Sequence, residues 1–266
     1  MTSLAAWVAV DQRAPSSFYL ASESRISFEN GKPSFDTAQK LFASTQYPDL
    51  FGYCGWIDFP FSVLESALKR IDGQQLFSQN DNAQARHDKF VAFLKDPSVS
   101  HLLNKQFTIL HAAREGKGMK ATFVFWSVSW SQERGWLSEP LSLPTESALV
   151  FSAGSGGKVI REHNDKWRHL LPRTSRSVFS AFCDAVRGGE DPNSGGAPQL
   201  VGLFRKGPGR YFGIVDEGKR YFCGKEVPDM EFYDRYEWRN AFFERCDFRT
   251  LARLPIAQRQ PRPREL

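Results

Sequence analysis

The chain has 266 residues, of which 41% are hydrophobic and 14% aromatic, so it can bury a substantial core as one large domain. Its formal net charge is +5, but the 35 basic residues are dispersed among 30 acidic ones, which does not indicate a nucleic-acid-binding surface. No stretch is apolar for long enough to span a bilayer and the first residues lack a signal-peptide pattern, so we expect a cytoplasmic protein without a membrane partner.

The first half of the chain combines short apolar runs with amphipathic segments. Leu4–Val10 and Phe18–Ala21, joined by a polar connection, predict a β-hairpin. A helix is predicted where apolar residues recur at helical spacing, namely Val63, Leu64, Ala67, Leu68 and Ile71. A second helix is expected around His87–Leu94, followed by strand-like runs at Phe107–His111 and Ala121–Trp130.

The second half repeats this order of strands and helices. Ala148–Ala153 is strand-like and leads through a glycine-rich turn into a helix from Val159. A further helix is expected after Thr174, strand structure resumes at Leu200–Phe204, and Tyr233–Leu254 is expected to be helical in part. Runs grouped in this way indicate a layered α+β architecture rather than an alternating parallel sheet.

Metal and nucleotide sites are not indicated by the sequence. The four cysteines and five histidines are scattered without the spacing of a zinc site or a disulfide framework. The segment from Gly154 to Lys158 resembles a phosphate loop only superficially, because the glycine that would precede it is Ser152 and Val159 replaces the Mg²⁺-binding hydroxyl. We therefore expect no cofactor and no metal.

Several charged and glycine-rich motifs occur at predicted strand or helix edges. Each taken alone suggests surface charges or a tight turn, as such residues usually do. In chain order they are Leu20–Arg25 with Glu23, Gln39–Leu41 with Lys40, Phe51–Asp58 with Gly55, Ala153–Gly156 with Ser155, and Asp191–Gly196 with Ser194. Over roughly the first 220 residues, this series resembles the proteasome β-subunit and bacterial HslV peptidase family.

The resemblance implies a fold and a chemistry. It implies a four-layer αββα sandwich of the N-terminal nucleophile (Ntn) hydrolase type over residues 1–225, with 226–266 as a C-terminal helical extension ending in a basic, proline-rich tail. It implies a threonine-type peptidase or amidohydrolase. The implied catalytic set is Thr2, Glu23, Lys40, Gly55, Ser155, Asp191 and Ser194, with the Gly55 N–H as oxyanion donor.

Two departures from the family pattern keep a second hypothesis open. The family's aspartate is Glu23 here, and no Gly-Thr processing bond lies near the start, although removal of Met1 would expose Thr2 and leave Ser3 on the opposite face of the strand. Thr2 requires a longer connection between the first two strands, whereas an alignment without that insertion places Ala5 at the nucleophile position. The alternative is therefore a catalytically inactive, proteasome-like assembly or interaction protein.

The same resemblance suggests partners. We expect a peptide or protein substrate, assembly into a homo-oligomer and a possible unfoldase or other protein partner. Trp126, Trp130 and Trp167 are candidates to cover interfaces between copies. We do not expect nucleic acid as a partner, because no recognition motif accompanies the tail arginines Arg259, Arg262 and Arg264.

Overall fold

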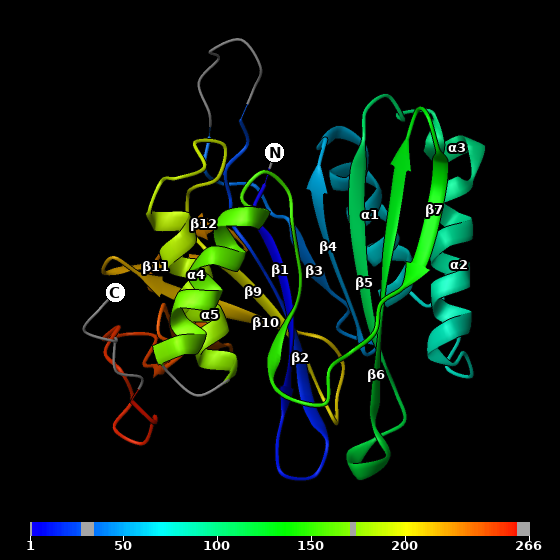
Figure 1. Ribbon diagram of the computed structural model, residues 1–266. Helices are drawn as coiled ribbons and strands as arrows, with labels where there is room; N and C mark the ends of the chain where they lie inside the picture. The colour runs from blue at the N-terminus through cyan, green and yellow to red at the C-terminus, as the bar shows by residue number, and fades with distance from the viewer. Residues whose placement is uncertain (1, 28–34, 171–173, 260–266) are drawn as a thin grey trace.

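The strands of the protein form two sheets (Figure 1). The computed structural model describes residues 2–27, 35–170 and 174–259. Within these ranges the larger sheet contains nine strands, β1 (Leu4–Val10), β2 (Pro15–Ser22), β8 (Ala148–Ala153), β9 (Gln199–Phe204), β10 (Arg210–Asp216), β11 (Lys219–Phe222), β12 (Lys225–Glu226), β13 (Glu237–Asn240) and β14 (Arg245–Cys246). The smaller sheet contains β3 (Leu41–Ala43), β4 (Asp49–Gly55), β5 (Phe107–Glu115), β6 (Thr122–Ser131) and β7 (Gly135–Pro140).

Pairing within both sheets is antiparallel, except that β13 runs parallel to β10. The larger sheet has the order β12-β11-β10-β9-β2-β1-β8, with β13 beside β10 and β14 beside β13, and the smaller one has the order β3-β4-β5-β6-β7. The predicted hairpin is confirmed as β1 and β2. Its loop covers only residues 11–14, since Val10 already pairs with Pro15.

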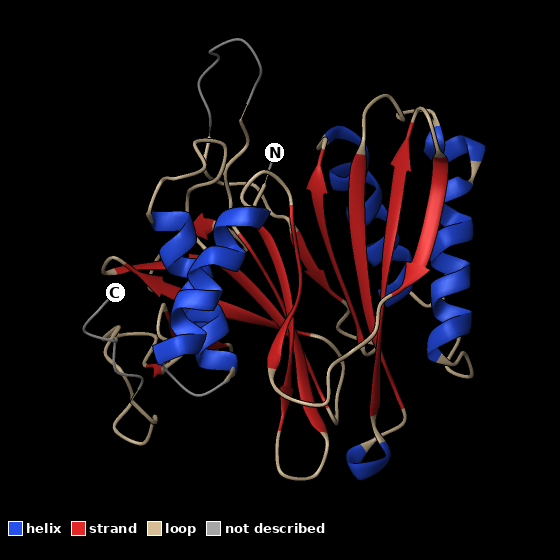
Figure 2. Ribbon diagram, in the orientation of Figure 1, coloured by secondary structure: helices blue, strands red, loops and turns tan. Residues whose placement is uncertain are grey.

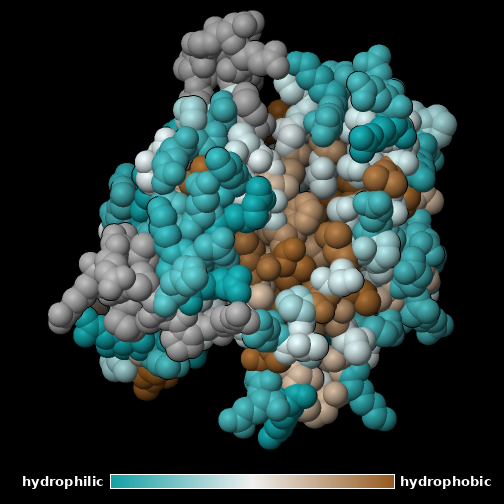
Figure 3. All heavy atoms as spheres, in the orientation of Figure 1, coloured by the Kyte–Doolittle hydropathy of each residue, from teal (hydrophilic) through white to brown (hydrophobic). Residues whose placement is uncertain are grey.

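One hydrophobic core lies between the facing sheets (Figure 2). Successive side chains of a strand point to opposite faces, so Leu4, Ala6 and Val8 of β1 enter this core, whereas Ala5 and Trp7 enter a second core on the outer side. The smaller sheet contributes Leu41, Leu50, Leu110 and Phe125 to the core between the sheets. In the hollow between the two halves of the molecule, apolar residues reach the surface (Figure 3).

Helices cover part of the outer face of each sheet. α4 (Gly157–Leu170) and α5 (Ser175–Arg187) pack on the larger sheet, and α1 (Asp58–Asp72) and α2 (Ala83–Lys95) pack on the smaller one. These elements confirm the predicted helices, and α5 begins at a capping box formed by Thr174 and Ser177. The other helical segments are short, namely α3 (Pro97–Ser100), α6 (Glu231–Asp234) and the 3-10 turn η1 (Gly118–Lys120).

The expected four-layer αββα sandwich is wrong as a description of the fold class. The protein is mostly antiparallel β-sheet and only 26% helical. On the larger sheet, the outer core is shared between α5 and non-helical residues near the C-terminus, including Ala241 and Phe243. Amphipathic helices were predicted correctly, but their number and length do not provide a full helical layer on that side.

The C-terminal segment differs from its prediction. Tyr233–Leu254 was expected to be helical in part, yet it holds only the end of α6, followed by β13 and β14. Trp238 of β13 lies against Gly213 of β10, where a β-carbon would lie 2.3 Å from the indole ring. Pairing of β13 with β10 and β14 thus replaces the helix that local spacing indicated.

Three further expectations concern the interface tryptophans, membrane spans and the tail arginines. Trp126 and Trp167, expected at interfaces between copies, are buried within the chain at 5% and 0% exposure. No helix among the described residues is both long and apolar enough to cross a membrane. The tail arginines Arg262 and Arg264 lie outside the described residues.

Candidate active site

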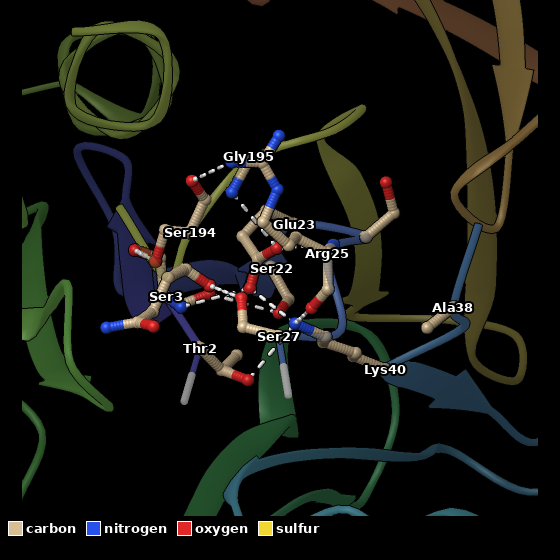
Figure 4. Close-up of polar contacts among 12 residues, drawn as sticks. Thr2, Ser3, Ser22, Glu23, Arg25, Ser27, Ala38, Lys40, Ser194 and Gly195 are labelled. Carbon is tan, nitrogen blue, oxygen red and sulfur yellow. Dashed lines mark hydrogen bonds and ion pairs between the residues drawn. The ribbon is translucent and has the colours of Figure 1, made fainter. Parts of the chain in front are cut away.

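A lysine, a glutamate and a threonine meet at the beginning of β1 (Figure 4). Lys40 Nζ donates a hydrogen bond to Thr2 Oγ1 at 3.1 Å and forms an ion pair with Glu23. Thr2 precedes β1, Glu23 follows the adjacent strand β2, and Lys40 precedes β3 of the other sheet. All three are buried, with 2% exposure for Thr2. The site therefore lies where the two sheets approach each other.

Burial perturbs both charged groups of this site. It raises the pKa of the Glu23 carboxyl and lowers the pKa of the Lys40 ammonium, while the attraction between the two opposes each shift. Each charge thus offsets part of the free energy needed to bury the other. Ionisable groups with perturbed pKa values cluster at functional sites, which makes this buried pair beside a hydroxyl a candidate site.

Backbone groups hold the Glu23 carboxylate in place. Its Oε1 accepts from Ser3 N at 3.2 Å, and its Oε2 accepts from Arg25 N at 2.6 Å and from Gly195 N at 3.3 Å. The contact with Gly195 brings the Asp191–Gly196 turn to this acid, as the sequence predicts. The longer side chain of glutamate is accommodated because these N–H groups surround its two oxygens.

A second polar cluster forms around Asp191. Its Oδ2 accepts from Ser155 Oγ and from Ser194 Oγ, each at 2.6 Å. Burial raises the pKa of Asp191, but hydrogen bonds from Ser155, Ser194 and Asn193 outweigh it and hold this pKa below its usual value. Asp191 is therefore poised to act as an anionic acceptor that orients hydroxyl groups.

Ser3 joins the two clusters and was not among the predicted site residues. Ser3 Oγ lies 2.8 Å from Ser194 Oγ, and its amide donates to Glu23. Its side chain is on the opposite side of the strand from Thr2, as expected, but that side belongs to the site. Asp191 and Ser194 were predicted site residues, whereas the hydrogen bond that links Ser3 to Ser194 depends on a tertiary contact between residues 191 positions apart.

The glycine turn after β8 packs directly on the backbone of Thr2. Gly154 has φ +83°, and a β-carbon there would lie 1.8 Å from Thr2 O. Gly156 N also donates to Thr2 O at 3.4 Å. Only glycine fits this approach at Gly154, and the contact fixes the position of the Thr2 backbone.

Gly55 lies at the end of β4 with φ +97°. A β-carbon at Gly55 would lie 2.8 Å from Gln106 O, so glycine is required here by both space and conformation. The neighbouring Cys54 interacts electrostatically with Lys40, which places this end of β4 near the site. The role of the Gly55 N–H as oxyanion donor stays a prediction.

Thr2, rather than Ala5, occupies the position beside Lys40. Ala5 pairs with Ala21 and enters the outer core, away from the polar cluster. The residues that were expected to form a long connection, Asp11–Ser17, are partly in β2, because Val10 pairs with Pro15 and the loop covers only residues 11–14.

A cleft of about 1100 Å³ adjoins the turn that carries Lys40. Ala38 and Gln39 of that turn line it, and most of the remaining wall is apolar, including Phe42, Ile57 and Phe61. Such a cleft is suited to an apolar side chain of a ligand. Among the described residues, no group of three or more His, Cys, Asp or Glu side chains is arranged to hold a metal ion.

Comparisons with known proteins give a fold likeness only. No family model matches the chain, and no curated protein matches its sequence. Among solved structures it is similar to the Anbu (Gly-1) mutant from Hyphomicrobium sp. strain MC1, with a TM-score of 0.53 and 11% identity over 88% of this chain and 90% of that one. At 11% identity, this structural similarity indicates a shared fold and nothing about activity.

The predicted membership of the proteasome β-subunit and HslV family is therefore wrong. It rested on short motifs at strand and helix edges, and no sequence-level match supports it. Motifs of this length encode local geometry, such as the turn at Gly154 and the lysine-bearing turn at Lys40. A chain can share that geometry through its fold without family-level similarity of sequence.

Proposed function

We propose that the protein is an N-terminal threonine hydrolase that cleaves peptide or amide bonds after removal of Met1. The observation that carries the proposal is the 3.1 Å contact between Lys40 Nζ and Thr2 Oγ1, next to the buried Glu23. A hydroxyl paired with a buried lysine at the first residue of the processed chain is suited to nucleophilic catalysis.

The reaction proceeds in two steps. The Thr2 hydroxyl attacks the carbonyl carbon and passes its proton to its own α-amine, whose ordinary pKa is about 8. The leaving amine takes up that proton as the carbon–nitrogen bond breaks, which leaves an ester between the substrate acyl group and Thr2. Water then attacks this ester, releases the acid and regenerates the hydroxyl, so no other co-reactant is required.

The surrounding residues have distinct roles in this scheme. Lys40 stabilises the oxygen of the attacking hydroxyl and lowers the proton affinity of the amine, while Glu23 orients Lys40. Asp191, together with the serines around it, positions the start of the chain. A backbone donor such as Gly55 N–H contributes about 3 kcal/mol to stabilisation of the oxyanion. The apolar cleft next to Lys40 receives a side chain of the peptide substrate.

Covalent labelling tests the proposal. A peptidyl epoxyketone reacts with a hydroxyl and an amine on the same residue, so it should modify the wild-type protein once Met1 is absent. Thr2→Ala should abolish this labelling. Thr122→Ala is the matched control, because Thr122 is exposed at the start of β6, and it should label at the wild-type rate. Equal labelling of folded Thr2→Ala and wild type would show that Thr2 is not the nucleophile.

A further inference from the structure

Gln199, the first residue of β9, contacts three backbone groups around the Lys40–Glu23 pair. Its Nε2 donates to Glu23 O at 3.0 Å and to Ala38 O at 2.7 Å, and its Oε1 accepts from Lys40 N at 3.0 Å. The residue is 2% exposed. One buried amide therefore joins the end of β2 to the turn that carries Lys40.

These contacts determine the orientation of the amide. Two carbonyl oxygens face one end of the side chain and an N–H faces the other, so the nitrogen must lie toward Glu23 and Ala38. Both N–H donors of Gln199 are used, and its oxygen is paired. No exchange of the two ends would preserve the hydrogen bonds.

The turn between β11 and β12 closes over this amide. Gly224 has φ +82°, and a β-carbon there would lie 2.9 Å from Gln199 Nε2, 2.9 Å from Ala38 O and 2.7 Å from Ser24 Cβ. Since even a methyl group does not fit, the turn shields the three hydrogen bonds from water. Buried hydrogen bonds of this kind are the ones whose loss is most costly.

We propose that Gln199 is the positioning residue that aligns Lys40 with Glu23 beside Thr2. The two side chains come from different segments, which are joined by a direct backbone bond, from Ala38 N to Ser24 O, and by Gln199. Of these links, only Gln199 binds the carbonyl of Glu23 and the amide of Lys40 themselves. Gln199 does not touch the reacting atoms. The effect of Gln199 on catalysis rests on the proposed function of Thr2. The alignment of Lys40 with Glu23 does not, because it can be measured without any reaction.

Gln199→Met keeps the length of the side chain and removes all three hydrogen bonds. We expect amide hydrogen exchange at Lys40 to become about 10-fold faster, as the loss of one buried hydrogen bond implies. We expect the maximal rate of epoxyketone labelling to fall about 100-fold, as a small misplacement of catalytic groups implies. The probe concentration at half-maximal rate should stay unchanged, because Gln199 does not line the cleft.

Gln84→Met is the matched control. Gln84 is exposed on α2, away from the site and the cleft, and its Nε2 donates to Asp88 Oδ1 at 2.8 Å. This variant should keep both the exchange rate at Lys40 and the maximal labelling rate. If Gln199→Met does not fold, Gln199→Glu replaces it, since it keeps the shape and the acceptor but lacks both N–H groups.

The outcomes separate this inference from the proposed function. Unchanged exchange at Lys40 in a folded Gln199 variant would overturn the alignment. Faster exchange with a wild-type maximal labelling rate would overturn the positioning role and leave the Thr2 function standing. Faster exchange in a protein whose wild type is never labelled would support the alignment and count against the Thr2 function.

Discussion

Lys40 and Glu23 form an ion pair inside the protein, with side-chain exposures of 1% and 0%. The pair is in contact with the hydroxyl of Thr2 and is held by backbone N–H groups from three parts of the chain. Breaking such a pair leaves an uncompensated charge in the interior, so stability and reactivity are both linked to it.

Lys40→Met should abolish labelling of Thr2 and lower the free energy of unfolding by about 3–5 kcal/mol, because Glu23 is left buried without its partner. Adding Glu23→Gln to this variant should restore part of the stability but none of the labelling. Urea denaturation and labelling rates measure the two effects. The control is the exposed Lys69–Glu65 pair, in which Lys69→Met should lower the free energy of unfolding by less than about 1 kcal/mol. A Lys40→Met protein that labels normally would contradict the role of Lys40.

A chain of hydrogen bonds buried beneath α2 predicts a pH dependence of stability. Asp49 Oδ1 lies 2.9 Å from His111 Nε2, His111 Nδ1 lies 3.0 Å from His87 Nδ1, and His87 Nε2 lies 2.8 Å from Ser138 Oγ. Because the Asp49 carboxylate accepts, neutral His111 donates from Nε2 and accepts at Nδ1. His87 then donates from Nδ1, and Ser138 donates to its Nε2.

Burial lowers the pKa of both histidines, and for His87 it lowers the value from 6.5 to about 3. As pH falls, His87 therefore binds a proton near pH 6.5 in the unfolded chain but only near pH 3 in the folded protein. Stability contributed by neutral His87 is present above pH 6.5 and is lost as pH falls toward 3, by up to about 1.4 kcal/mol per pH unit.

Urea denaturation between pH 7 and pH 4 measures this loss, and His87→Gln should make the profile flatter. His101→Gln, at an exposed histidine, should leave the profile as in wild type. A wild-type profile with the same slope as that of His87→Gln would show that His87 is not held neutral.

Gly154→Ala should displace the backbone of Thr2 and abolish labelling. The new β-carbon would lie 1.8 Å from Thr2 O, whereas Gly135, which also has positive φ, has nothing within 4 Å of that position. Gly135→Ala should therefore cost only the conformational strain of about 1–2 kcal/mol and keep full labelling. Equal stability and labelling of the two variants would contradict the close approach at Gly154.

Self-association remains a prediction, and static light scattering at micromolar concentration measures it directly. We expect a mass that is a multiple of the 30.3 kDa chain. Large apolar side chains are exposed at Met230, Phe232 and Ile256, and burying them against another copy would be favourable. A mass of 30.3 kDa across the concentration range would contradict this expectation.

Local patterns in the sequence were sufficient for several elements of the fold. The β1–β2 hairpin and helices α1, α2 and α5 follow from apolar periodicity and turn residues, which act over a few neighbouring positions. The fold class was not predicted correctly, because it depends on how much of each sheet the helices cover. Helix coverage of a sheet is decided by long-range packing. Phe243, for example, is not in a helix but is part of the core on the outer side of the larger sheet.

In the candidate site, too, local motifs predicted some residues, and others depend on long-range contacts. Glu23, Lys40 and Asp191 were found from the short motifs around them, and they lie in two clusters joined by Ser3. Gln199 was missed, since a glutamine at the start of a strand carries no local signal. Its importance comes from partners 161 and 176 residues away in the chain, Ala38 and Glu23.

Nucleophilic attack by Thr2 is tested most directly by the mass of the N-terminal peptide after the protein is treated with the epoxyketone and digested. We predict a peptide that begins at Thr2, lacks Met1 and carries one equivalent of the probe on Thr2, bonded through both the hydroxyl and the α-amine. A peptide that retains Met1, or one that begins at Thr2 and carries no probe while the probe is found on another residue, would contradict the central claim that Thr2 is the nucleophile.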